Sequence, residues 1–205
     1  EKVDFRNNVI YNWGANNAYA AEGGSYNLVN NYYKPGPASK TNKYFINPYA
    51  DDGKNHQPAG IFGRFYLKGN VMEGNRTITK NNASGVKMGS NFKELAPNVT
   101  LNELISNTEF SIPKPKTQSA KEAYQSVLKY AGCSLVRDAP DKRYVEEART
   151  GTFTFTGSKG STNGLIDSQN DVGGLPEYKS QPAPKDANQD GIPDGWLEKY
   201  YPEKK

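Results

Sequence analysis

Oxygen-bearing side chains recur at every second position near the end of the chain. The run begins at Asp186 and continues through Asn188 and Asp190, with Gly191 next and Asp194 three residues further on. Carboxylate and amide oxygens from one short loop can surround a hard cation. Ca²⁺ is such a cation, because it takes several oxygen ligands in a flexible geometry. This spacing therefore predicts a calcium-binding loop.

The loop matches the beginning of the EF-hand pattern, in which alternate residues bind the ion and a glycine at the sixth position makes a sharp turn. The seventh position supplies a backbone carbonyl, here that of Ile192. At the twelfth position the EF-hand pattern has an acidic ligand, but this chain has Leu197 there. Glu198, one residue later, would have to bind the ion instead. The predicted metal ligands are Asp186, Asn188, Asp190, Ile192, Asp194 and Glu198. The alternative is an acidic, turn-rich linker without a metal.

The composition of the chain argues against several classes of partner and mechanism. The net charge of +4 is spread over 205 residues with no Lys/Arg-rich block, so nucleic acid is not expected as a partner. No apolar run approaches the length of a membrane span. Cys133 is the single cysteine, and its apolar neighbours predict a packed thiol. His56 is the single histidine and lies in a polar loop, which argues against a histidine-dependent mechanism.

Three windows that could position a binding surface share one pattern and align on Asn8, Asn31 and Asn70. Apolar or aromatic residues stand five and three positions before each asparagine and one position after it, and these positions share one face of an extended strand. Asn8 and Asn31 are 23 residues apart, about one coil of a parallel β-helix. We therefore predict parallel strands at 3–11, 26–33 and 65–72, with the asparagines stacked at one corner.

The predicted fold class is all-β: the late coils of a right-handed parallel β-helix, with a C-terminal extension of one or two short helices and loops packed on it. Residues 1–95 are assigned to the coils and their loops. Residues 96–185 are assigned to the extension that covers them, and residues 186–205 to the acidic loop and a short helix.

Two helices are expected in the extension. Ser119 and Glu122 have the spacing of a capping box, which predicts a helix over residues 119–131. A second helix is predicted at 141–148, with Asp141 as its cap, and an alternating pattern predicts a strand at 150–156.

Seven stretches, taken by their order and spacing, carry a resemblance to a known family: 3–14, 21–37, 65–70, 130–132, 137–138, 164–169 and 171–178. With the windows aligned, the chain resembles the family 1 polysaccharide lyases, the pectate lyases, and especially the secreted enzymes of Bacteroides-type bacteria. The resemblance implies cleavage of α-1,4-galacturonan by β-elimination with Ca²⁺ as cofactor, polygalacturonate or pectin as partner, and a secreted, periplasmic or cell-surface location.

In such lyases an arginine removes the C5 proton of a galacturonate, and a calcium ion held by aspartates from earlier coils neutralises the sugar carboxylate. Neither the arginine segment nor those aspartates can be matched here, and Arg6 lies beyond the family's arginine segment. We therefore expect the chain to be the C-terminal part of a longer protein. Its catalytic residues would precede residue 1, and an N-terminal fragment of the same protein would be a partner.

Charged and aromatic residues in or beside the aligned strands are candidate substrate contacts. Tyrosines could stack on sugar rings, whereas each charge could equally be a solvated surface group and each ring a packed one. The candidate charged contacts are Arg6, Glu22, Lys34 and Lys68, and the candidate rings are Tyr19, Tyr32 and Tyr33.

Two other functions remain open. One is a non-catalytic β-helix module that binds acidic polysaccharide. The other is a β-helix hydrolase of the polygalacturonase type, which would need aspartates clustered on neighbouring coils. No pair of acids in residues 1–95 occupies equivalent coil positions, which counts against the hydrolase.

Overall fold

The computed structural model describes residues 1–54, 56–113 and 115–204. They form two compact units, residues 1–174 and residues 175–205. All strands in the described part of the chain belong to the first unit. Within the same described residues, no helix combines the length and the apolar character that crossing a membrane requires.

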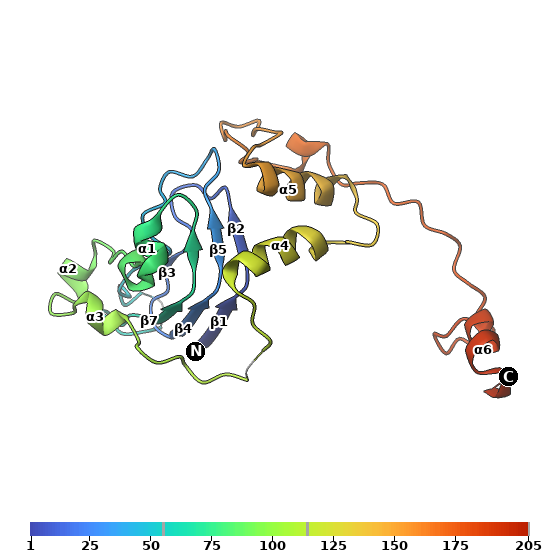
Figure 1. The fold of residues 1–205 in the computed structure, drawn as a ribbon, viewed down its shortest axis with the longest axis horizontal. Helices are drawn as coiled ribbons and strands as arrows, with labels where there is room; N and C mark the ends of the chain where they lie inside the picture. The colour runs from blue at the N-terminus through green and yellow to red at the C-terminus, as the bar shows by residue number, and fades with distance from the viewer. Residues whose placement is uncertain (55, 114, 205) are drawn as a thin grey trace. The chain divides into compact units, whose positions relative to one another are not determined.

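Among the described residues, the strands form three small sheets, and the paired strands within each sheet run parallel (Figure 1). The first sheet consists of β1 (Lys2–Arg6), β4 (Ser25–Val29) and β7 (Arg64–Lys68). The second consists of β2 (Val9–Tyr11), β5 (Tyr32–Lys34) and β8 (Val71–Met72). The third consists of β3 (Tyr19–Ala20) and β6 (Asn47–Pro48).

The predicted register of the three windows is confirmed. Phe5 pairs with Leu28, and Leu28 pairs with Leu67. Beyond the turn, Tyr32 pairs with both Val9 and Val71. Side chains alternate along a strand, so each column keeps its members on one face.

The predicted fold class, however, is wrong. The sheets contain only two or three short strands each, they do not close into a coiled solenoid, and 26% of the chain is helical. Neither the all-β class nor a right-handed parallel β-helix therefore describes this structure. The pattern failed beyond Met72 because no further apolar window aligns there, and the chain turns to short helices instead.

The predicted asparagine stack is confirmed. Asn8 donates its side-chain amide to Asn31 Oδ1 at 3.0 Å, and Asn31 donates to Asn70 Oδ1 at 2.9 Å. The residue before each of these three asparagines adopts positive φ: Asn7 at 54°, Asn30 at 52° and Gly69 at 69°. The two positions of each turn thus have different roles. The first adopts the left-handed backbone conformation, and the second makes the inter-strand hydrogen bonds.

Two clusters of buried side chains lie against the sheets. The larger contains Leu28, Phe65 and Leu104, and the smaller contains Tyr33, Phe45 and Met72. Burial of each such side chain contributes about 1.5–3 kcal/mol.

Short helices after β8 complete this core, although only coils and loops were predicted up to residue 95. Each provides one buried apolar side chain: Ile78, Phe92 or Leu104. These helices are α1 (Arg76–Lys80), α2 (Phe92–Leu95) and α3 (Leu101–Leu104), with a 3₁₀ turn η1 (Asn82–Gly85) between the first two.

Helix α4 (Ala120–Tyr130) confirms the first predicted helix, and Ser119 and Glu122 form its capping box. Helix α5 (Ala139–Thr150) confirms the second but is longer than expected. Its N-cap is Asp138 and not Asp141, because Pro140 fits the first turn, where no backbone donor is needed. Asp141 instead accepts the backbone N–H of Cys133 at 2.8 Å.

Two smaller predictions fail. No strand forms at 150–156: Thr150 ends α5, and the Thr154 N–H donates to the Glu147 carboxylate in place of a neighbouring strand. Cys133 is exposed, because the apolar residues Leu135 and Val136 beside it are exposed as well and offer it no packing. The remaining elements are η2 (Gln169–Val172) in the first unit, and α6 (Asp194–Tyr200) and η3 (Pro202–Lys204) in the second.

Candidate functional site

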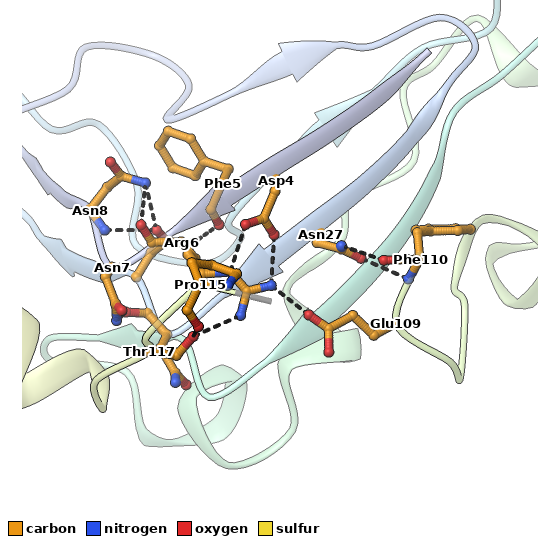
Figure 2. A network of polar contacts seen from close by, with 12 residues as sticks. Asp4, Phe5, Arg6, Asn7, Asn8, Asn27, Glu109, Phe110, Pro115 and Thr117 are labelled. Atoms are coloured by element: carbon orange, nitrogen blue, oxygen red, sulfur yellow. Dashed lines mark hydrogen bonds and ion pairs between the residues drawn. The ribbon is translucent and has the colours of Figure 1, made fainter. Parts of the chain in front are cut away.

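Arg6 lies at the end of β1 beside a cleft of about 470 Å³. Its guanidinium makes two hydrogen bonds of 2.7 Å to Asp4, as Figure 2 shows. The same group donates to Glu109, and to the Thr117 hydroxyl at 3.1 Å. Its side chain is only 12% exposed. Arg6 is thus held between two carboxylates, and most of its donors already have protein partners.

These contacts keep Arg6 protonated. The hydrogen bond to Asp4 is the main cause that raises the pKa of Arg6 above its ordinary value; burial opposes it, and Glu109 adds to it. A guanidinium so stabilised cannot take up a proton near neutral pH. The geometry therefore favours a positioning role, in which Arg6 ties the segment around Thr117 to the sheet.

Asparagine amides hold the same segment to the first sheet. Asn27 is fully buried and makes two hydrogen bonds to the backbone of Phe110, at 2.9 and 3.0 Å (Figure 2). Asn7 makes a similar pair to the backbone of Gln118, at 2.8 and 2.9 Å. These amides give the segment partners that an additional strand would otherwise supply.

Lys34 is buried. Its ammonium donates to the carbonyl of Arg149 at 2.9 Å and to the Tyr124 hydroxyl at 3.1 Å. Tyr124 also stacks on Tyr32, with ring centroids 4.5 Å apart. Because Arg149 lies in the last turn of α5, Lys34 satisfies a carbonyl that the helix leaves free. Lys34 joins β5 to both α4 and α5.

The other predicted contacts are scattered. Glu22 lies in the loop before β4, where its backbone carbonyl accepts from Gln57 at 3.0 Å. Lys68 is exposed at the end of β7. In the described part of the chain, no hydrogen bond or ion pair joins any two of Arg6, Glu22, Lys34 and Lys68. Of the candidate rings, Tyr33 is buried and Tyr32 is covered by Tyr124, whereas Tyr19 is 63% exposed.

The acidic loop at the end of the chain is organised by hydrogen bonds from its own backbone. Asp186 Oδ2 accepts from the Gly191 N–H at 2.9 Å, and Asp190 Oδ1 accepts from the Ile192 N–H at 2.9 Å. Asp194 Oδ1 accepts from the Ala187 N–H at 3.0 Å. Asn188 and Asp190 also bond to each other through their side chains, at 3.0 Å.

Two observations bear on whether this loop could hold a cation. Oδ1 of Asp186 is buried and has no hydrogen-bond donor among the described residues, which leaves a charged oxygen without compensation. On the other hand, in the residues that the structure describes, no three His, Cys, Asp or Glu side chains come close enough together to hold a metal ion. The donor chemistry fits Ca²⁺, but the carboxylates would have to turn toward a common centre to bind it.

A second hollow, of about 490 Å³, lies beside β6 and was not anticipated from the sequence. Asn47, Tyr49, Lys87 and Lys93 are among the residues that line it. These residues lie outside the three aligned apolar windows, so the windows could not predict the hollow. The sequence feature that points to it is the number of tyrosines in this part of the chain, which include Tyr19 and Tyr49.

The comparisons with known proteins find relatives that share one name. No family model matches the chain. The chain is 30% identical over 203 residues to a protein of Aspergillus terreus named probable pectate lyase C, and 29% identical over 206 residues to one of that name from Aspergillus fumigatus. A third of the same name, from Aspergillus flavus, is 27% identical over 195 residues. Each match covers 93% of this chain and 40% of the relative.

The chain thus spans about 40% of the length of the curated relatives it matches. Over nearly its whole length, it is similar to a part of fungal proteins that are named probable pectate lyases.

Proposed function

We propose that this chain is part of a secreted, family 1 pectate lyase-like protein that cleaves α-1,4-galacturonan by calcium-assisted β-elimination. The similarity to proteins named probable pectate lyase C, which extends over 93% of the chain, carries this proposal. The net charge of +4 is compatible with an acidic polysaccharide as substrate.

The reaction requires a base for the C5 proton and a cation that neutralises the sugar carboxylate. Arg6 does not fit the role of the base, because it is charge-paired with Asp4 and Glu109. The described residues also contain no cluster of three or more His, Cys, Asp or Glu side chains that could hold a catalytic calcium ion as they stand. We therefore assign both catalytic parts to residues outside this chain, and no step of the reaction to the residues within it.

Products distinguish this proposal from its alternatives. Protein expressed from the complete gene should convert polygalacturonate to unsaturated products, seen as a rise in ultraviolet absorbance that a calcium chelator abolishes. New reducing ends without that rise would indicate a hydrolase. Binding of polygalacturonate without any cleavage would indicate a non-catalytic module.

We assign a separate, structural Ca²⁺ to the loop of the second unit. The proposed ligands are Asp186, Asn188, Asp190, the carbonyl of Ile192, Asp194 and Glu198. The buried, unpartnered Oδ1 of Asp186 supports this assignment, because a cation would compensate its charge. This ion would order the loop and take no part in cleavage.

A further inference from the structure

Three segments between β8 and α3 carry the acceptor sequence for N-linked glycosylation, which is asparagine, any residue except proline, then serine or threonine. They are Asn75-Arg76-Thr77, Asn82-Ala83-Ser84 and Asn98-Val99-Thr100. The attached glycan is bulky and hydrophilic, so a folded protein accommodates it only at a surface asparagine. The structure therefore distinguishes the three asparagines by their exposure and by the partners of their amides.

Asn82 is excluded by its burial. Only 8% of this residue is exposed, and its amide nitrogen donates to the carbonyls of Asn70 at 2.9 Å and Ile78 at 2.8 Å. A sugar on this nitrogen would replace one of its two hydrogens and leave a buried carbonyl without a donor, which is costly. Because the glycan is transferred before the chain folds, a chain modified at Asn82 could not complete its core.

Asn75 is half-buried and already caps a helix. Its Oδ1 accepts the backbone N–H groups of Thr77 at 3.1 Å and Ile78 at 3.3 Å, at the start of α1. Its amide nitrogen donates to the Asn42 carbonyl at 2.9 Å, so it points to the loop that contains Asn42 and not into solvent. A glycan on this nitrogen would displace that loop and loosen the cap, so we expect Asn75 to stay unmodified in the folded protein.

Asn98 differs from both of these residues. It is exposed in the turn between α2 and α3, where the Val99 N–H donates to the Ala96 carbonyl at 3.1 Å. Within the ranges that the structure describes, the Asn98 side chain forms no hydrogen bond. Its amide nitrogen can therefore carry a sugar without the loss of a protein contact.

The residues around Asn98 keep it at the surface. Ala96 is buried in the larger core cluster, and Val99 and Leu101 pack against the same cluster. Thr100 is the N-cap of α3, and its exposed hydroxyl completes the acceptor sequence. The connection between α2 and α3 lies at the periphery of the first unit (Figure 1). The core thus anchors both sides of the turn and leaves Asn98 in solvent.

We propose that Asn98 is an N-glycosylation site and that Asn75 and Asn82 carry no glycan in the folded protein. The donor is an oligosaccharide linked through pyrophosphate to a lipid. The Asn98 amide nitrogen forms a bond to C1 of the first sugar and loses a proton. The bond from C1 to the phosphate oxygen breaks, and the lipid pyrophosphate leaves with the electron pair. The glycan stands at the rim of the hollow beside β6, because Pro97 and Val99 line that hollow.

The proposal rests on one part of the proposed function, the secreted location, because this transfer takes place in the secretory pathway. Fungi, the source of the relatives compared above, have a secretory pathway of this kind. The site does not depend on whether the complete protein is a lyase.

The test is secretion of the chain from a yeast host, followed by mass spectrometry before and after treatment with peptide N-glycosidase. This enzyme removes the glycan and converts the asparagine that carried it to aspartate. The wild type should carry one glycan, and a peptide map should locate the conversion at Asn98. Asn98→Gln should be secreted without a glycan. Thr100→Ser keeps both the acceptor sequence and a capping hydroxyl, so it is the matched control and should keep the glycan. Thr77→Ala and Ser84→Ala destroy the other two acceptor sequences and should each keep one glycan, as the wild type does.

The outcomes separate the site from the proposed function. A wild type secreted without a glycan, or a glycan that remains on Asn98→Gln, would overturn the site and leave the proposed lyase activity standing. A glycan on Asn98, in a protein whose complete form cleaves no polygalacturonate, would support the site and overturn the lyase. Wild type and Asn98→Gln produced without glycosylation should unfold at the same urea concentration, because the Asn98 side chain makes no hydrogen bond in the described part of the chain.

Discussion

Asn82 Oδ1 accepts the backbone N–H of Asn70 at 2.7 Å and its side-chain amide at 3.1 Å, although Asn82 lies in a 3₁₀ turn and not in a strand. Asn70 makes the same two bonds to Asn82 that Asn31 makes to Asn70. The amide stack therefore has four members and continues past the last strand of the second sheet. It joins the helical segment to the sheets.

Removal of one buried member should be costly. Asn70 is fully buried and exchanges hydrogen bonds with Asn31, Asn82 and the Leu28 carbonyl. Asn70→Ala should lower the free energy of unfolding by about 3 kcal/mol or more, because several buried polar partners lose their bonds together. Urea unfolding measures this change. Asn81→Ala, at the exposed neighbour of Asn82, should change it by less than about 0.5 kcal/mol. Similar losses in both variants would show that the stack has no special role.

The stack also shows what the sequence could reveal. Asn8, Asn31 and Asn70 were predictable because apolar positions at fixed offsets mark the strand around each one. Asn82 has no such window, because η1 places it by a helical turn. The fold class failed for the same reason: three aligned windows describe the local pairing but not how far the sheets extend or whether they close. Lys34 could not be recognised as buried, because its partners lie 90 and 115 residues further along the chain.

Lys34 should be required for attachment of α4 and α5. Lys34→Met keeps most of the aliphatic side chain but leaves the Arg149 carbonyl and the Tyr124 hydroxyl without their donor. We expect faster amide hydrogen exchange over residues 120–150, with a loss of about 1–3 kcal/mol. Exchange in β1, β4 and β7 should change little. Lys121→Met on the exposed face of α4 is the control. Uniform acceleration throughout the first unit would mean that Lys34 stabilises the fold globally.

Ionisation of Tyr11 should lower the free energy of unfolding at alkaline pH. Burial is the main cause that raises the pKa of Tyr11 to about 12, with contributions from Glu147 and Tyr124, and its hydroxyl donates to the Thr152 carbonyl. In the unfolded chain its pKa is about 10, so between these values the folded state binds more protons than the unfolded state. Its contribution is complete below about pH 10 and is lost as the pH rises through 12. Tyr11→Phe should make the decline in stability over this range less steep. Tyr130→Phe, at an exposed ring, should leave the slope unchanged.

The chain alone should not cleave polygalacturonate, because neither a base nor a catalytic calcium site is assigned to it. Incubation with calcium should give no rise in ultraviolet absorbance, whereas protein from the complete gene should give one. Adding a separately made N-terminal fragment should restore the rise if the two parts associate. Unsaturated products from the isolated chain would contradict this assignment and would make Arg6 a candidate for the base.

The acidic loop should take up one Ca²⁺. The ion would compensate the buried Oδ1 of Asp186, and the other ligand oxygens would turn away from their present backbone donors to reach it at roughly 2.3–2.6 Å. Trp196 lies in α6 directly after this loop, so its fluorescence should change as the ion binds. Calorimetric titration should show one site in the wild type and none in Asp190→Ala. Glu177→Gln, an exposed acid of the same unit outside the loop, should bind like wild type. Equal uptake by wild type and Asp190→Ala would mean that the loop is an acidic turn held by its own backbone.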